Sequence, residues 1–323
     1  MRRIFLSLVL SLVPAVGLAQ GASKPPAKVD TAKLTFRWPE NVTARVDAQR
    51  YRERHNGGRH DTSDARVSYR MTAQRSGAEY VVRFSDFQMH GEAREARASE
   101  AAAFMERLGG IAPSYRVTAA GEFARLESPD MLRKLIDSLL TSMSAKEGAP
   151  PPQLMQVMTS MLSDEVLTAT AAYEWNALVG AWVGAELEVG EVYGSEGEEP
   201  VPIFQNATVK FQYEFSAVRR MSCDSVAAPQ ARDCIELEMV SRPDSAAMRQ
   251  LLERFMGTFA PEEAKAVGFT DFNVENVVTL VARPESLVPV SLVVAKHVTG
   301  TVRSGGKTSK MDQLDVKSQR YTY

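Results

Sequence analysis

The sequence predicts an α+β protein with one large, curved antiparallel sheet of about nine or ten strands and amphipathic helices packed on one face. Two observations predict this class. In many segments apolar residues alternate with polar ones, which is typical of antiparallel strands with one buried face. From roughly residue 128 to residue 175, apolar residues instead recur every three or four positions, as they do along one side of a helix.

The N-terminal residues 1–19 have the three-part layout of a secretory signal peptide. Arg2 and Arg3 precede an apolar run from Ile4 to Val13, and small residues lead to Ala19, after which we expect cleavage. This run is shorter than the roughly 20 apolar residues of a spanning helix, and no later run is longer, so we predict no transmembrane segment in the mature chain. We therefore expect a periplasmic or secreted protein.

The mature chain is nearly balanced in charge. Losing Arg2 and Arg3 changes the formal net charge from −2 to −4, which gives no general attraction for nucleic acid. Residues 20–32 contain small residues, Lys and Pro, and are expected to form a flexible leader. Residues 33–323 are expected to form a single α+β domain, either undivided or as two packed halves, 33–180 and 181–323.

Strand patterns dominate the N-terminal part of this domain. Apolar residues alternate at 34–38, 42–48, 67–71 and 80–84, and a shorter pair of strands is expected at 115–119 and 123–126. Arg75-Ser76-Gly77 supplies a hairpin turn. The Ala- and Glu-rich segment 91–108 is expected to be helical, and the polar segment Arg52–Asp64 is expected to be a loop.

Amphipathic helices are expected in the middle of the chain. Ser128-Pro129 is a helix start, and an apolar stripe follows it as far as Leu140. After the break at Pro150–Pro152, the helical pattern resumes and continues, with a break near Ser163, to about Trp175. The resumed helix carries Leu154, Met155, Met158, Met161 and Leu162.

Strand patterns return in the C-terminal part. The clearest strand is Thr208–Val218, and further strands are expected at 185–192, 235–239, 272–282, 288–298 and 311–323. One face of the clearest strand carries Val209, Phe211, Tyr213 and Phe215, and one face of the last strand carries Asp315, Lys317, Gln319 and Tyr321. Asp244 or Ser245 is expected to cap a helix that ends at Gly257.

Cys223 and Cys234 are the two cysteines of the chain. They flank a turn-rich segment between two strand patterns, so we predict a disulfide that closes a hairpin in an oxidising compartment. Closing so short a loop stabilises the fold by on the order of 3 kcal/mol. A redox or metal role is not favoured, because the cysteines do not form a Cys-x-x-Cys pair.

The sequence contains no decisive catalytic motif. It lacks the Gly-x-Ser-x-Gly and His-Glu-x-x-His patterns of common secreted hydrolases, so we favour a non-catalytic protein without a cofactor. His55 and His60 lie in the polar segment beside Asp61 and Asp64, where a surface metal site is one interpretation. Because a Gly-containing loop does not fix ligand geometry, we interpret it as a solvated loop and predict no metal site.

Methionine is concentrated in the central helices. Flexible thioethers can repack around apolar shapes, so we hypothesise a ligand pocket lined by Leu154, Met155, Met158, Met161 and Leu162, with an ordinary core as the alternative. Between Arg45 and Arg83, nine arginines stand against five acidic residues. That excess is interpreted as a solvated face or as a contact surface for anionic envelope components.

The order of the predicted elements along the chain resembles that of known proteins. It combines N-terminal strands, the Gly121-Glu122-Phe123 turn, Met-rich helices, the Trp182-Val183-Gly184 approach to a strand and long C-terminal hairpins. In this it resembles uncharacterised secreted β-rich proteins of bacteria, and its outline is similar to the periplasmic lipoprotein carriers, in which helices and a curved sheet enclose an apolar cavity. The resemblance implies a carrier of a lipophilic molecule, with no binding residue transferred.

The sequence is also compatible with two other classes of function. An envelope structural or protein-interaction protein would have a filled core and an exposed contact patch. An atypical hydrolase would have a cleft with converging polar groups. The sequence leaves the oligomeric state and the identity of any ligand undetermined.

Overall fold

We describe the fold from a computed structural model of the 323-residue chain. The structure describes residues 29–90, 114–127, 163–201, 207–224, 230–259, 267–304 and 306–323, with the single residues Asp130 and Lys134. The predicted signal peptide and the predicted helix at 91–108 lie outside the described residues. The same holds for the proposed pocket residues Leu154, Met155, Met158, Met161 and Leu162.

The main sheet has eleven strands in the order β6-β5-β4-β3-β2-β13-β12-β11-β10-β9-β8, and every neighbouring pair is antiparallel. Its strands are β2 (Asn41–Asn56), β3 (Arg59–Ser76), β4 (Glu79–His90), β5 (Tyr115–Thr118), β6 (Phe123–Leu126), β8 (Val192–Val201), β9 (Ala207–Met221), β10 (Cys234–Pro243), β11 (Val267–Ala282), β12 (Pro289–Ser304) and β13 (Lys307–Thr322). Because β13 pairs with β2, both ends of the chain contribute to one sheet.

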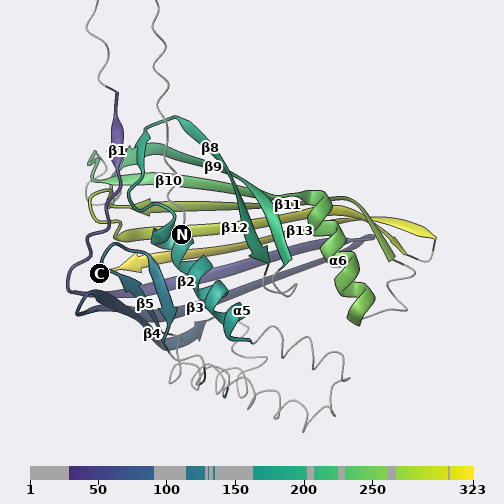
Figure 1. The fold of residues 1–323 in the computed structure, drawn as a ribbon, viewed down its shortest axis with the longest axis horizontal. Coiled ribbons are helices and arrows are strands. Elements are labelled where there is room, and N and C mark those ends of the chain that lie inside the picture. The colour runs from purple at the N-terminus through teal and green to yellow at the C-terminus, as the bar shows by residue number, and fades with distance from the viewer. Residues whose placement is uncertain are drawn as a thin grey trace, which may run out of the picture.

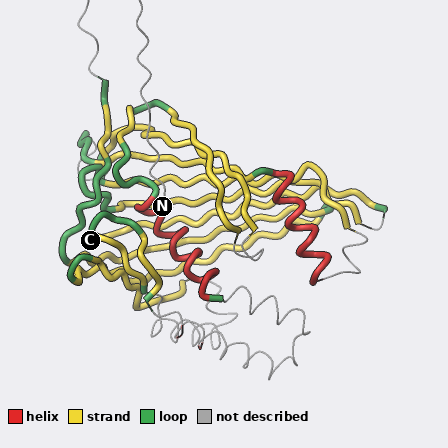
Figure 2. Tube along the Cα trace, viewed as in Figure 1, coloured by secondary structure: helices red, strands yellow, loops and turns green. Residues whose placement is uncertain are grey.

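A few smaller elements complete the described fold. Strands β1 (Thr31–Lys33) and β7 (Glu186–Glu188) form a separate two-stranded sheet. The helices are α5 (Asp164–Trp175), which continues into the π-helical turn η1 (Asn176–Gly180), and α6 (Ser245–Phe259). Both α-helices lie on the same side of the main sheet, as Figures 1 and 2 show. No helix among the described residues is long and apolar enough to span a membrane.

The predicted α+β class, with its sheet of nine or ten strands and amphipathic helices packed on one face, is wrong. The chain is mostly β, with one eleven-stranded sheet and two short α-helices in the part that the structure describes. The helix α5 buries only Ala171 and Trp175 and has no continuous apolar stripe. Its position therefore depends on a few large contacts rather than on an amphipathic face.

The polar segment Arg52–Asp64, predicted to be a loop, instead forms the far ends of β2 and β3. The two strands stay in register up to the pair Asn56 and Arg59, and the turn between them has positive φ at Gly57 (56°) and Gly58 (88°). Positive φ at both central residues matches the twist of a two-residue hairpin. The strand signal was missed because this hairpin end is polar and largely exposed on both faces, so no apolar alternation marks it.

Short local signals predicted other features correctly. Asp244, one of the two residues predicted to cap a helix, caps α6 by accepting from the Ala247 N–H at 2.7 Å. Ser163, predicted only as a break in a longer helical segment, is the N-cap of α5, and its Oγ accepts a hydrogen bond from the Val166 N–H. The predicted disulfide between Cys223 and Cys234 is present. It joins the segment after β9 to the start of β10, with 5.0 Å between the two Cα atoms.

An aromatic cluster holds α5 against the sheet. The Trp175 ring packs 5.4 Å from Trp38, 6.0 Å from Phe36 and 5.8 Å from Tyr115, measured between ring centroids. Its indole N–H donates to the Gly121 carbonyl at 2.8 Å. Trp175 is fully buried with its polar atom paired, so a single side chain fixes the C-terminal end of α5.

We predict that Gly121→Ala destabilises the protein by about 2–4 kcal/mol, because it adds overpacking to an unfavourable backbone conformation. Gly121 has φ of +87°, and an added Cβ would lie 2.6 Å from Phe36 Cγ. The matched control is Gly184→Ala, at φ of +77° with no atom within 4 Å of the added Cβ. Urea unfolding followed by tryptophan fluorescence should show a clearly smaller loss for the control. Equal losses would mean that the contact with Phe36 is unimportant.

Candidate functional site

An apolar cavity of about 470 Å³ lies between α5 and the sheet face that this helix covers, here called the inner face. It is enclosed by β2, β3, β4, β5, β12 and β13 below and by α5 and η1 above. The side chains that line it are mainly apolar or aromatic: Ala48, Val67, Tyr69, Phe84, Phe87, Tyr115, Thr170, Ala171, Tyr173, Glu174, Ala177, Leu178, Leu292, Val294, Lys317, Gln319 and Tyr321.

A β-bulge shapes the aromatic wall of the cavity. Phe84 and Phe87 are three residues apart, so in a regular strand they would point to opposite faces. The register between β3 and β4 shifts between Ser68 and Arg70, and Asp86 has a positive φ of 57°. This bulge turns both phenylalanines toward the cavity, where their rings lie 5.8 and 5.1 Å from the ring of Tyr69.

Three side chains form a polar chain on the cavity floor. Gln319 is buried, and its Nε2 donates to the Tyr69 hydroxyl at 3.0 Å, while the Tyr321 hydroxyl donates to its Oε1 at 2.8 Å. Burial, and then the negative charge of Glu174, raise the pKa of Tyr69. Burial likewise raises the pKa of Tyr321. Both phenols therefore stay protonated and neutral, which suits an apolar surrounding.

At one end of the cavity the inner face becomes charged. Lys317 Nζ donates to Glu174 Oε1 of α5 at 3.0 Å and so links the sheet to the helix. Arg50 lies opposite Lys317 in the register and donates to both oxygens of Asp315 at 2.8 and 2.6 Å. Arg52 donates a third hydrogen bond to Asp315 at 2.9 Å.

This charged strip carries more positive than negative groups. Lys296 stands opposite Asp315 on β12 and is exposed. The strip thus consists of four cations and two anions, a net charge of +2: Arg50, Arg52, Lys296, Lys317, Glu174 and Asp315. The cavity and the strip together make an amphipathic site, apolar under α5 and cationic at its edge.

The opposite face of the sheet has a larger hollow of about 840 Å³, which is a weaker candidate. Its lining includes Arg45, Asp47 and Arg66, whose side chains are 65, 52 and 63% exposed. Such exposed charges remain hydrated, so they offer little driving force for binding an apolar molecule. The cavity under α5 combines enclosure with an apolar lining and is the better candidate.

The pocket residues predicted from the methionine pattern lie outside the described residues, so their part in the site stays a prediction. The shared face of Asp315, Lys317, Gln319 and Tyr321 was recognised in the sequence, but not as part of a site. The sequence signal for the site is the change along one strand face from the charged residues Asp315 and Lys317 to the aromatic Tyr321. Only the pairing with β2 and the placement of α5 turn that pattern into a cavity wall.

Comparison of the sequence with models of protein families and with curated proteins finds no match. Among solved structures, the chain is similar to lipovitellin, in a structure described as showing lipid–protein interactions. The identity is 7% and the TM-score 0.41, and the match covers 88% of this chain and 25% of that one. A second match is OmpT, an outer membrane protein of Vibrio cholerae, at 5% identity and a TM-score of 0.17, covering 88% and 100% of the two chains. Both scores are too low to assign a shared fold.

We predict that Asp315→Asn destabilises the protein at neutral pH but not in acid. The hydrogen bond from Arg50, with a further one from Arg52, holds the pKa of Asp315 below its ordinary value of 3.8. The ionised carboxylate is therefore stabilising above about pH 5, and this contribution is lost as pH falls through 3.8 and the lower folded-state pKa.

The measurement is the urea midpoint of both proteins across this pH range. The gap between parent and variant should close in acid, because a protonated Asp315 resembles asparagine. A gap that is independent of pH would contradict this explanation. Asp312→Asn, an exposed carboxylate on the other face of β13, serves as the control.

Proposed function

We propose that this is a non-catalytic periplasmic or secreted protein that binds a lipophilic molecule with an acidic head group, such as a fatty acid. The observation that carries the proposal is the amphipathic site, with an apolar cavity under α5 that opens beside a cationic strip. The disulfide supports folding in an oxidising compartment.

The apolar part of the site suits a hydrocarbon chain. A cavity of about 470 Å³ lies within the range of about 300–1,000 Å³ that is usual for small-molecule sites. Leu178, Leu292 and Val294 contribute aliphatic surface, and Tyr69 and Phe87 contribute aromatic surface. The phenol of Tyr69 already has a hydrogen-bond partner, so covering it with hydrocarbon would leave its hydroxyl group satisfied.

The charged strip supports an acidic head group. Lys317 lines the cavity and is 40% exposed, so a carboxylate beside it would meet the ammonium group while remaining partly hydrated. Arg50 is the next cation in the same row of the sheet. An uncharged head group would gain no such attraction, so the site should distinguish an acid from the corresponding alcohol.

The methionine-rich segment remains part of the proposal. Leu154 to Leu162 ends directly before Ser163, the N-cap residue of α5. We propose that its thioethers contribute further apolar surface for the same ligand, as flexible Met side chains adapt to variable hydrocarbon shapes.

We predict that Val294→Trp weakens binding of a fluorescent long-chain fatty acid at least tenfold, because the indole would occupy the cavity. Val293→Trp is the matched control, since the neighbouring residue is also half-buried but points to the opposite face. Fluorescence titration of the purified full-length protein measures both affinities. Equal affinities of the two variants, or no uptake by the parent protein, would overturn the proposed site.

We further predict that Lys317→Glu weakens binding of the fatty acid about fivefold, corresponding to about 1 kcal/mol, and leaves binding of the matching fatty alcohol nearly unchanged. The reversed charge would stand beside Glu174 and repel a carboxylate. Lys310→Glu, near the far end of β13, changes the net charge equally and should have little effect. Equal losses for acid and alcohol would contradict a role of Lys317 in binding the head group.

A further inference from the structure

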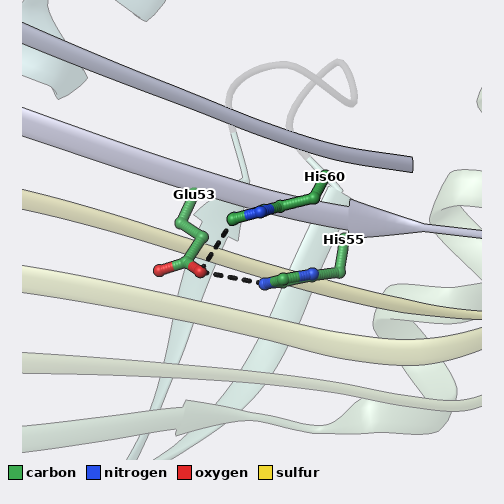
Figure 3. Close-up of side chains that lie close together, drawn as sticks. All are labelled: Glu53, His55 and His60. Carbon is green, nitrogen blue, oxygen red and sulfur yellow. Dashed lines mark hydrogen bonds and ion pairs between the residues drawn. The ribbon is translucent and has the colours of Figure 1, made fainter. Parts of the chain in front are cut away.

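The end of the β2–β3 hairpin brings two histidines and a glutamate together on the outer face, the sheet face opposite α5. His55 and His60 stand directly opposite one another in the register, and Glu53 precedes His55 by two residues on the same face. The imidazole rings are stacked, with 4.1 Å between their centroids. Figure 3 shows both rings turned toward the same carboxylate.

The distances within this cluster suit coordination of one ion. Nε2 of His55 lies 2.9 Å and Nε2 of His60 3.1 Å from Oε1 of Glu53, and three potential ligand atoms lie within 4.8 Å of one another. Two ligand atoms on a tetrahedral Zn²⁺ ion, each about 2.0–2.1 Å from it, are roughly 3.3 Å apart. A small outward movement of the side chains would therefore admit the ion.

The surroundings orient the carboxylate and leave the cluster accessible. The Tyr51 hydroxyl donates to Oε2 of Glu53 at 3.0 Å, which leaves Oε1 facing the histidines, as a supporting residue of a metal site does. Both imidazole side chains are 51% exposed. An ion could enter from solvent, and water or an external group could complete its coordination.

Neighbouring charges favour a cation at this position. Asp312 of β13 stands opposite His55 on the outer face. Arg59, next to His60, points to the inner face, where its guanidinium pairs with Asp61 at 2.8 Å. Glu53 of the hairpin thus contributes a carboxylate to the cluster, Asp312 adds an acidic residue on the neighbouring strand, and Arg59 is directed away from the histidines.

We propose that Glu53, His55 and His60 form a binding site for a divalent transition-metal ion such as Zn²⁺. Two imidazoles and a carboxylate are a ligand set that Zn²⁺ and Cu²⁺ accept, with a fourth position open to solvent. The sequence-based prediction of a loop is wrong here, since these residues lie on β2 and β3, and our proposal departs from the prediction of no metal site. A strand pair with a two-residue turn fixes the ligands on one face, whereas a loop would not. It is independent of the lipophilic site on the inner face.

The test is calorimetric titration of the untagged, metal-free full chain with Zn²⁺, repeated with Cu²⁺. We expect one equivalent to bind with a micromolar or lower Kd, and Cu²⁺ to bind more tightly than Zn²⁺. His55→Ala and His60→Ala should each weaken binding at least tenfold. Tyr51→Phe should weaken it less, because Tyr51 only orients the carboxylate.

The matched control is His297→Ala, on the same face. His297 Nε2 also contacts a carboxylate, Asp312 Oδ1, at 2.8 Å, but that pair offers one imidazole instead of two. This variant should retain the parent affinity. Circular dichroism would confirm that each variant is folded. Absence of Zn²⁺ binding, or binding that survives both His55→Ala and His60→Ala, would overturn the proposal.

Discussion

The placement of Trp175 is the constraint on which the candidate site depends. Its ring contacts Phe36, Trp38 and Tyr115, and its indole N–H reaches the Gly121 carbonyl, so one residue joins several distant parts of the chain. Because α5 has no apolar stripe, these contacts attach it to the rest of the fold, as an apolar face does in an amphipathic helix. They hold one end of α5 on the sheet, and the cavity lies under the helix.

The register of the sheet determines which side chains lie below that helix. Along β13, Tyr321, Gln319, Lys317 and Asp315 all point to the inner face, in an order that runs from buried aromatic to charged. The paired residues of β2 follow the same order, from Val46 and Ala48 to Arg50 and Arg52. On both strands the side chains of the inner face change from apolar to charged in the same direction, so the pairing of β2 with β13 makes the surface amphipathic. Such a surface suits the proposed ligand, which has an apolar chain and an acidic head group.

The same two-residue alternation separates the two proposed sites. On β2, Arg50 and Arg52 face the inner side, while Tyr51, Glu53 and His55 face the outer side. The strand therefore contributes cations to the edge of the cavity and the proposed metal ligands to the opposite face. Neither set disturbs the other, because the backbone layer lies between them.

The sequence by itself determined the features that depend on neighbouring residues. Alternation marked most of the strands, Asp244 marked a helix start, and the turn-rich segment between Cys223 and Cys234 marked the disulfide. The predicted fold class is wrong, since the described residues are mostly β with two short α-helices. The polar end of β2 was missed as a strand because it carries no apolar alternation. Tertiary structure alone decided both sites, since Tyr69 meets Gln319 from 250 positions away and His55 meets His60 only if the hairpin closes in one register. Local pattern fixes the face to which a side chain points, but which strands become neighbours depends on the free energy of the whole assembled sheet.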